Sequence, residues 1–156
     1  MSNDNNQKNL IETAVDLHKN GQINKALNLY LELIKTEENN PQLLFLLGTA
    51  YVQLEKTEQG INYLERSLSI KPDNASAHSN LGNALKNLNR YEEALTSFDK
   101  AINLNPNFAD AYSNRGVILQ EMRHYDEALQ SYDNAIKINP KHFFSHGNRG
   151  ITLKDL

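Results

Sequence analysis

Three asparagine residues recur at one interval in the C-terminal half of the chain. Asn80, Asn114 and Asn148 are each separated by 34 residues. An asparagine amide donates and accepts hydrogen bonds, so a row of such amides can bind a peptide backbone with little regard for its sequence. The interval brings the three amides into one row only if the chain folds as a stack of similar units. Ser79, Ser113 and Asn83 lie beside this row and could contribute to it.

Catalytic and metal-binding patterns are weak by comparison. His142 and His146 have the i, i+4 spacing of a helical metal site, but no Asp or Glu lies close in sequence to complete it. We expect His78 and His146 to be packing residues instead. The glycines stand singly within helical patterns rather than in a phosphate-binding loop. No Ser-His-Asp or paired-carboxylate pattern stands out, so we predict no enzyme activity, no cofactor and no metal site.

The 34-residue period extends well beyond the asparagines. It recurs in three further sets: Gly48, Gly82, Gly116 and Gly150; Pro72, Pro106 and Pro140; and the small residues Ala26, Gly60, Ala94 and Ala128. A period of this length indicates stacked helix-turn-helix units. We divide the chain into a flexible N-terminus at 1–6, repeats at 7–40, 41–74, 75–108 and 109–142, and a half repeat of one helix at 143–156. The predicted fold is an all-α solenoid of four repeats plus one helix.

Each unit is expected to contain two amphipathic helices that cross closely at the small residues. In the third unit Gly82 and Ala94 make this crossing tight, and Phe98 fills the wider space beyond it. The second unit has Gly60 and Ser67 where the third and fourth units have alanines. Because glycine within a helix costs about 1 kcal/mol relative to alanine, we expect this unit to be the weakest of the stack.

These residues resemble the tetratricopeptide repeat (TPR) family. Repeat four shows the pattern as Tyr112, Arg115, Gly116, Leu119, Ala128, Tyr132, Ala135 and Pro140. The resemblance implies a right-handed superhelix whose first helices line a concave groove for an extended peptide or a partner helix. The asparagine row is similar to that of the O-linked N-acetylglucosamine transferases. The alternative is that these asparagines are only solvated surface residues in an Asn-rich protein.

Another use of the family's groove is a clamp of Lys, Asn and Arg side chains for acidic chaperone C-termini. Neither frame of this chain supplies the cations, and Asp110 would repel a carboxylate. The N-terminal part of the groove differs, since Phe45 and Leu46, together with Ile11, Val15 and Val52, could form an apolar patch for a partner. Alternatively, the segment 2–7 covers this patch, or the repeat frame is off by one.

The composition is that of a mixed, soluble surface. The net charge is −3, charged residues make up 22% of the chain and cysteine is absent. No basic excess points to nucleic acid, and no apolar run approaches the roughly 18 residues of a membrane span. We expect a cytoplasmic protein with no membrane insertion.

We therefore predict a scaffold for protein-protein interaction. Peptide-binding candidates are Asn80, Asn114, Asn148, Asn83, Ser79, Ser113, Phe45 and Leu46. Two alternatives stay open. The chain could be the N-terminal substrate-recruiting region of a larger enzyme, such as a glycosyltransferase of the O-linked N-acetylglucosamine transferase type. It could also be a self-assembling structural scaffold, a homo-oligomer formed through an uncapped C-terminal end, where Ile151 and Leu153 lack a partner helix.

Overall fold

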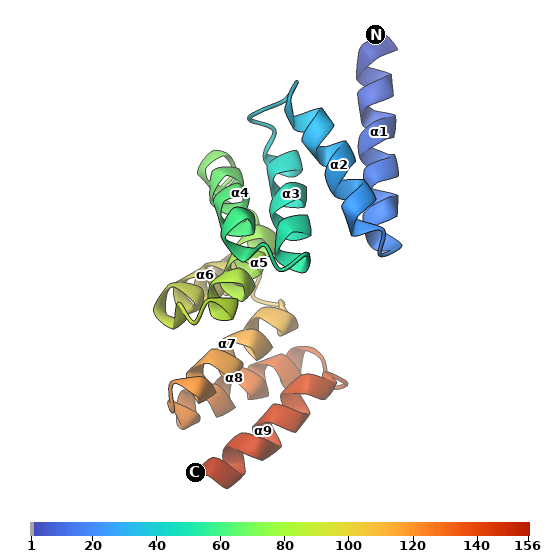
Figure 1. Cartoon of the computed structure of the whole chain (residues 1–156). Helices are drawn as coiled ribbons and strands as arrows, with labels where there is room; N and C mark the ends of the chain where they lie inside the picture. The colour runs from blue at the N-terminus through green and yellow to red at the C-terminus, as the bar shows by residue number, and fades with distance from the viewer. Residues whose placement is uncertain (1) are drawn as a thin grey trace. The chain divides into compact units, whose positions relative to one another are not determined.

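The computed structural model describes residues 2–156, with side chains from Gln7 onward, and every regular element in this part is an α-helix. The helices are α1 (Ser2–Lys19), α2 (Ile23–Ile34), α3 (Pro41–Gln53), α4 (Thr57–Ile70), α5 (Ala75–Asn87), α6 (Tyr91–Leu104), α7 (Ala109–Glu121), α8 (Tyr125–Ile138) and α9 (Phe143–Asp155). They form four antiparallel pairs followed by α9 (Figure 1). The predicted all-α solenoid of helix pairs is confirmed.

The chain divides into two compact units at 1–72 and 73–156. The N-terminal unit contains α1 to α4, and the C-terminal unit contains α5 to α9. The single repeat domain that the sequence predicts over 7–156, with its repeat boundaries, stays a prediction. The segment 1–6 was predicted to be flexible. Met1 and the side chains of residues 2–6 lie outside the described part, so this flexibility stays a prediction.

The turn inside each pair has one backbone conformation in all four repeats. One residue of each turn has a positive φ: Gly21 (74°), Glu55 (60°), Asn89 (58°) and Arg123 (62°). The following residue then donates its N–H back to the first helix, as Arg90 does to the Leu85 carbonyl at 3.0 Å. This bond satisfies a carbonyl that the helix end leaves unpaired. The Asn20-Gly21 turn predicted for repeat one is confirmed, while Glu55 and Arg123 adopt this conformation without being glycine.

The last residue of a repeat stands directly before the next helix, and its side chain decides how well that helix is capped. Asn40 accepts hydrogen bonds from the backbone N–H groups of Gln42 and Leu43, and Asn74 accepts one from Ala77. At the start of α9 the His142 ring accepts from the Ser145 N–H. Phe108, at the start of α7, makes no side-chain cap. Asparagine is a favoured N-cap because its short side chain reaches these donors.

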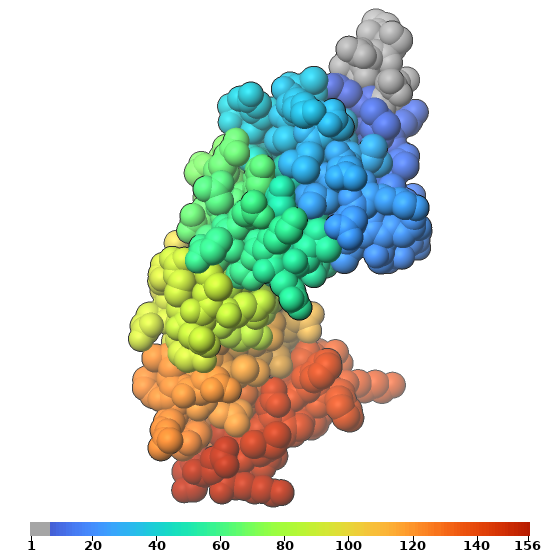
Figure 2. Space-filling model, in the orientation of Figure 1, coloured from blue at the N-terminus to red at the C-terminus, as the bar shows by residue number. Residues whose placement is uncertain are grey.

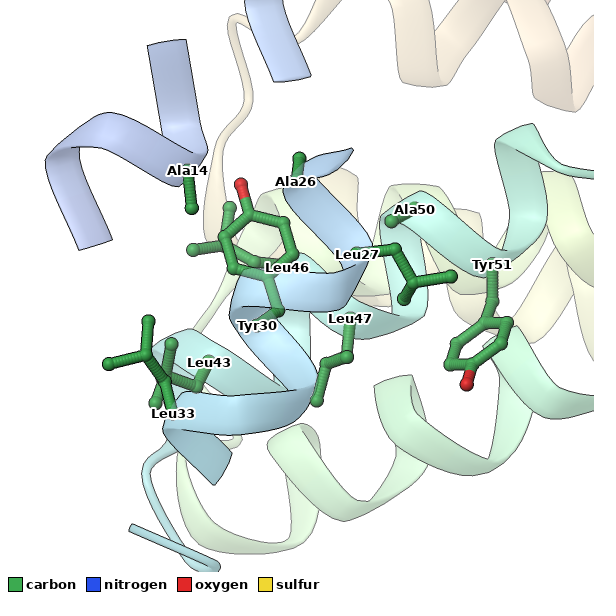
Figure 3. Close-up of a cluster of buried hydrophobic side chains, with 10 residues drawn as sticks. All are labelled: Ala14, Ala26, Leu27, Tyr30, Leu33, Leu43, Leu46, Leu47, Ala50 and Tyr51. Atoms are coloured by element: carbon green, nitrogen blue, oxygen red, sulfur yellow. The ribbon is translucent and has the colours of Figure 1, made fainter. Parts of the chain in front are cut away.

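A large apolar cluster holds the N-terminal unit together. It gathers side chains from the first three helices: Ala14, Ala26, Leu27, Tyr30, Leu33, Leu43, Leu46, Leu47, Ala50 and Tyr51 (Figure 3). The fully buried Tyr30 hydroxyl lies 3.3 Å from His18 Nδ1, and burial raises the pKa of Tyr30 to about 12. A phenol in such surroundings remains protonated and keeps its hydrogen bond at neutral pH.

The α3–α4 pair crosses at two facing glycines. A methyl group added at Gly60 would lie 2.9 Å from the Gly48 carbonyl oxygen and 2.5 Å from a methyl carbon of Val52. Alanine therefore has no room at position 60. The prediction that this repeat is weakened because Gly60 replaces an alanine is wrong. Ser67 is equally well placed, because its buried hydroxyl donates to the Pro41 carbonyl at 2.8 Å.

In the α5–α6 and α7–α8 pairs an aromatic ring of the second helix packs against the glycine of the first. A methyl at Gly82 would lie 2.9 Å from the Phe98 ring, and one at Gly116 would lie 2.6 Å from the Tyr132 ring. Both rings are fully buried. The tight crossing predicted at Gly82 is confirmed, but the Phe98 ring lies directly against Gly82 and not in a wider space beyond the crossing. These contacts fix how the first helix of each repeat sits on the second.

Candidate functional site

The first helices of the C-terminal unit surround one open cavity of about 450 Å³. Its lining combines amides, hydroxyls and apolar side chains: Ser79, Asn80, Asn83, Phe108, Asp110, Ser113, Asn114, Val117, His142, Phe144 and Asn148. These residues belong to α5, α7, α9 and the residues just before α7 and α9. Six of the eight predicted site residues therefore lie around one cavity.

The three asparagines of the row all line this cavity, and each is partly exposed. They come from three successive first helices at the same repeat position. Ser79 and Ser113 are only 3% and 4% exposed, so they form the floor of the cavity rather than its rim. The stacking that the 34-residue interval requires is thus present. Peptide binding by these residues remains a proposal.

Two arginines tie the lining helices to the helices behind them. Arg115 of α7 donates to Asp99 of α6 at 2.7 Å and to the buried Ser131 hydroxyl at 2.8 Å. Arg149 of α9 repeats the first contact with Asp133 of α8, at 2.6 Å. Both arginines stand one residue after a row asparagine. Since these pairs are partly exposed, we assign them mainly a role in register, not a large share of the stability.

Tyr132 of α8 packs against α7 and hydrogen-bonds to it. Its ring packs against Gly116, and its hydroxyl donates to the Gln120 side chain at 3.0 Å. Burial raises the pKa of Tyr132 well above its usual range, and the nearby Glu121 carboxylate raises it further. The hydroxyl stays protonated at neutral pH, so it remains a hydrogen-bond donor to α7.

His142 links Asp110 of α7 to the first turn of α9, a role that the sequence analysis missed. Its Nδ1 accepts from the Ser145 backbone N–H at 3.3 Å, and its Nε2 lies 2.9 Å from Asp110 Oδ1. Because Nδ1 is an acceptor, the ring hydrogen is on Nε2, and this N–H donates a hydrogen bond to the Asp110 carboxylate. The sequence signal was the repeat position, since His142 stands where Asn40 and Asn74 cap their helices.

The same contacts superficially resemble a hydrolytic triad. Ser145 Oγ lies 2.9 Å from His142 Nδ1, and His142 contacts Asp110 through its other nitrogen. A nucleophile must reach its substrate, however, and Ser145 is fully buried. Its backbone N–H is also occupied by the same ring nitrogen. We interpret the three residues as a helix cap that anchors Asp110.

The two apolar candidates lie elsewhere. Leu46 belongs to the core cluster of the N-terminal unit and is 9% exposed, and Phe45 packs against that cluster. Ile11 and Val15 also pack there. Leu46 thus offers little surface to a partner, because the side chains that the sequence placed on a groove are used for packing. We leave both Phe45 and Leu46 out of the site proposed below.

The remaining histidines divide between core and surface. His78 is buried, as expected, whereas His146 is exposed and contacts the Pro140 carbonyl at 3.0 Å. The packing role predicted for His146 is wrong because no helix of the described chain covers that face of α9. Within the described residues no group of three or more His, Cys, Asp or Glu side chains is placed to hold a metal ion. None of the described helices is long and apolar enough to span a membrane.

Comparison with family models identifies the class of protein. A model described as TPR repeat matches residues 48–89 and 82–122, and a model described as tetratricopeptide repeat matches 109–142. Together these matches run over more than half of the chain. With the repeated helix pairs they show that the chain belongs to the tetratricopeptide repeat proteins. Residues 1–67 also match the model of the anaphase-promoting complex, cyclosome, subunit 3. No curated protein sequence matches this chain.

Solved structures agree on the fold. A MamA protein has 24% identity and a TM-score of 0.84, over 95% of this chain and 81% of that one. MamA 41-end from Desulfovibrio magneticus RS-1 has 20% identity and a TM-score of 0.85, over 96% and 85% of the two chains. The first TPR of Spaghetti (RPAP3), bound to the HSP90 peptide SRMEEVD, has 21% identity and a TM-score of 0.72, over 74% and 91%. At these identities the likeness shows the fold alone.

Proposed function

We propose that this chain is a protein-interaction scaffold whose C-terminal unit binds an extended peptide segment. The observation that carries the proposal is the convergence of Asn80, Asn114 and Asn148 on one open cavity. Three amides from successive repeats can each exchange hydrogen bonds with a peptide backbone. The cavity also offers Phe108, Val117 and Phe144 as apolar surface beside these amides.

The mechanism follows from this mixture of groups. Backbone-directed hydrogen bonds supply affinity for many sequences, and the apolar and charged side chains between them supply selectivity. The lining helices are held in place from behind. Ser79 and Ser113 are buried at the floor of the cavity. Arg115 and Arg149 pair with Asp99 and Asp133 on the neighbouring helices. A site held in this way orders fewer groups when the peptide binds, which favours affinity.

The test uses a library of random-sequence 12-residue peptides, selected against the whole chain, with affinities measured by fluorescence anisotropy. Replacing Asn80, Asn114 and Asn148 together by Ala removes three amides, each worth about 0.5–1.5 kcal/mol. We expect roughly tenfold or greater loss of affinity with unchanged circular dichroism. The matched control replaces Asn28, Asn62 and Asn103, three exposed helix residues outside the cavity. Equal affinity of the two triple variants would remove the asparagine row from the mechanism.

One finer alternative is a substrate-recruiting region of a glycosyltransferase of the O-linked N-acetylglucosamine transferase type. Its support is the asparagine row, which is similar to that of the O-linked N-acetylglucosamine transferases. The similar solved structures described above include MamA proteins and the first TPR of Spaghetti (RPAP3) bound to an HSP90 peptide. A scaffold and a substrate-recruiting region would both bind peptides through the asparagine row. The triple asparagine variant therefore tests peptide binding in both cases.

A second candidate function, self-association, has its own observation. The α9 surface exposes Phe143 at 82% and Leu153 at 50%, and a methyl added at Gly150 would meet no atom within 4 Å. The side chains of α9, red in Figure 2, lie at the surface of the C-terminal unit. Exposed apolar residues of this kind mark contact surfaces. Sedimentation velocity over a hundredfold concentration range would show an increase in mass that Phe143→Ser with Leu153→Ser abolishes; a constant monomer mass would exclude this candidate.

A further inference from the structure

The cavity of the C-terminal unit has an unbalanced charge. Among its lining residues only Asp110 is an acid, and no lysine or arginine of the described side chains lines it. His142 beside Asp110 is largely buried and accepts the Ser145 N–H through Nδ1. The carboxylate is 74% exposed, so it keeps access to solvent and to a ligand. The cavity therefore presents a negative charge without a cation of its own.

Asp110 is also held in place. The His142 ring is 8% exposed and anchored by Ser145, and its Nε2 contacts Asp110 Oδ1 at 2.9 Å. The contact uses one carboxylate oxygen and leaves Oδ2 for another donor. A carboxylate fixed in this way loses less side-chain freedom when it binds a ligand.

An exposed aromatic ring shares the cavity with this carboxylate. Phe144 of α9 is 72% exposed, although apolar side chains of this size are usually buried. A carboxylate and an aromatic face in one hollow suit a guanidinium, because the planar cation forms paired hydrogen bonds with the acid and stacks on the ring. An ammonium group would satisfy the same pair less completely.

We propose that the Asp110–Phe144 pair gives the cavity a preference for a cationic side chain, arginine above lysine, on the bound segment. This inference rests on the proposed function, because the segment itself would be held by the asparagine row. It predicts that this cavity prefers a cationic segment, whereas the peptide in the RPAP3 structure is acidic. Like charges that meet without a counter-ion lower affinity, so an acidic residue beside Asp110 would be rejected.

The first experiment probes the cation alone. N-acetyl-arginine methylamide and its neutral isostere N-acetyl-citrulline methylamide are titrated into the ¹⁵N-labelled chain and followed by amide chemical shifts. We expect saturable shifts around Asp110 and Phe144, with the arginine probe binding roughly fivefold or more tightly than citrulline. Asp110→Asn should make the two probes equal, and Phe144→Leu should weaken the arginine probe several-fold. Asp126→Asn, which changes the same charge on exposed α8 surface, should change neither.

A second arm separates this inference from the proposed function. The peptides selected from the random library are scored for arginine and lysine against glutamate and aspartate, for the wild type and for Asp110→Asn. Enrichment of cations that disappears in the variant supports the inference. Bound peptides without that enrichment, or equal binding of the two small probes, overturn the cationic preference and leave peptide binding standing. Discrimination between the probes without any bound peptide overturns the proposed function and leaves the cation site standing.

Discussion

The two units use the same repeat position for opposite purposes. In α3 of the N-terminal unit this position is Leu46, which packs in a core built from three helices. In α5, α7 and α9 of the C-terminal unit it is asparagine, and all three amides line an open cavity. The helix pairs are otherwise alike, since each has one turn residue with a positive φ. The α3–α4, α5–α6 and α7–α8 pairs also cross tightly at glycine. A residue that the repeat itself does not require can therefore become part of a core or line an open cavity.

The largest expected effect comes from exchanging these residues. Leu46→Asn removes a buried apolar side chain and leaves an amide in its place, so the free energy of unfolding should fall by about 3–5 kcal/mol. Asn114→Leu should change stability by less than about 1 kcal/mol, since Asn114 is partly exposed. Urea unfolding followed by circular dichroism measures both variants. Similar losses in the two variants would break the contrast between the units.

The glycines offer a second contrast. Gly60→Ala would bring a methyl 2.9 Å from a backbone carbonyl, so we expect a loss of about 1–3 kcal/mol in spite of the better helix propensity. Gly150→Ala has no atom within 4 Å and should gain up to about 1 kcal/mol. Thermal unfolding of the two variants beside the wild type measures the difference. A stabilised Gly60→Ala would restore the view that repeat two is weakened by its glycine.

The helix caps sharpen the comparison at smaller energies. Asn74→Ala and His142→Ala each remove a side-chain acceptor at a helix start, and each should cost about 1 kcal/mol. His142→Asn should recover most of that loss, because asparagine can accept the Ser145 N–H, while the contact with Asp110 is lost. Amide hydrogen exchange in the first turn of α9 reports this locally. Exchange in His142→Asn as fast as in His142→Ala would argue against the capping role.

The smallest expected effect concerns the turns. Arg123 and Glu55 have positive φ values of 62° and 60°, where a side chain other than glycine is strained. Arg123→Gly and Glu55→Gly should each stabilise the chain by up to about 1 kcal/mol, partly offset by the greater freedom of glycine when unfolded. Gly21→Ala should have the opposite sign. The midpoints of urea unfolding would decide, and a destabilised Arg123→Gly would mean that the Arg123 side chain makes a compensating contact.

Much of the architecture was predictable because it repeats. Local periodicity and small-residue spacing predicted the tight crossing at Gly82, the turn at Gly21 and the alternation of two helices per 34 residues. Helix propensity describes an isolated helix, whereas the Gly48 carbonyl and Val52 decide which side chain fits at position 60, so the prediction for Gly60 was wrong. His146 failed for a related reason, because a repeat position predicts burial only where a neighbouring helix covers it.

The sequence by itself determined the class of protein, the helix pairs and the row of asparagines, since each depends on residue types at a fixed period. Only the tertiary structure decided which neighbours join that row. Asp110 and His142 are 32 residues apart, yet they lie in contact because α7 and α9 pack side by side. It also decided that Leu46 belongs to a core, because burial depends on the helices that surround a side chain and not on its place in the repeat.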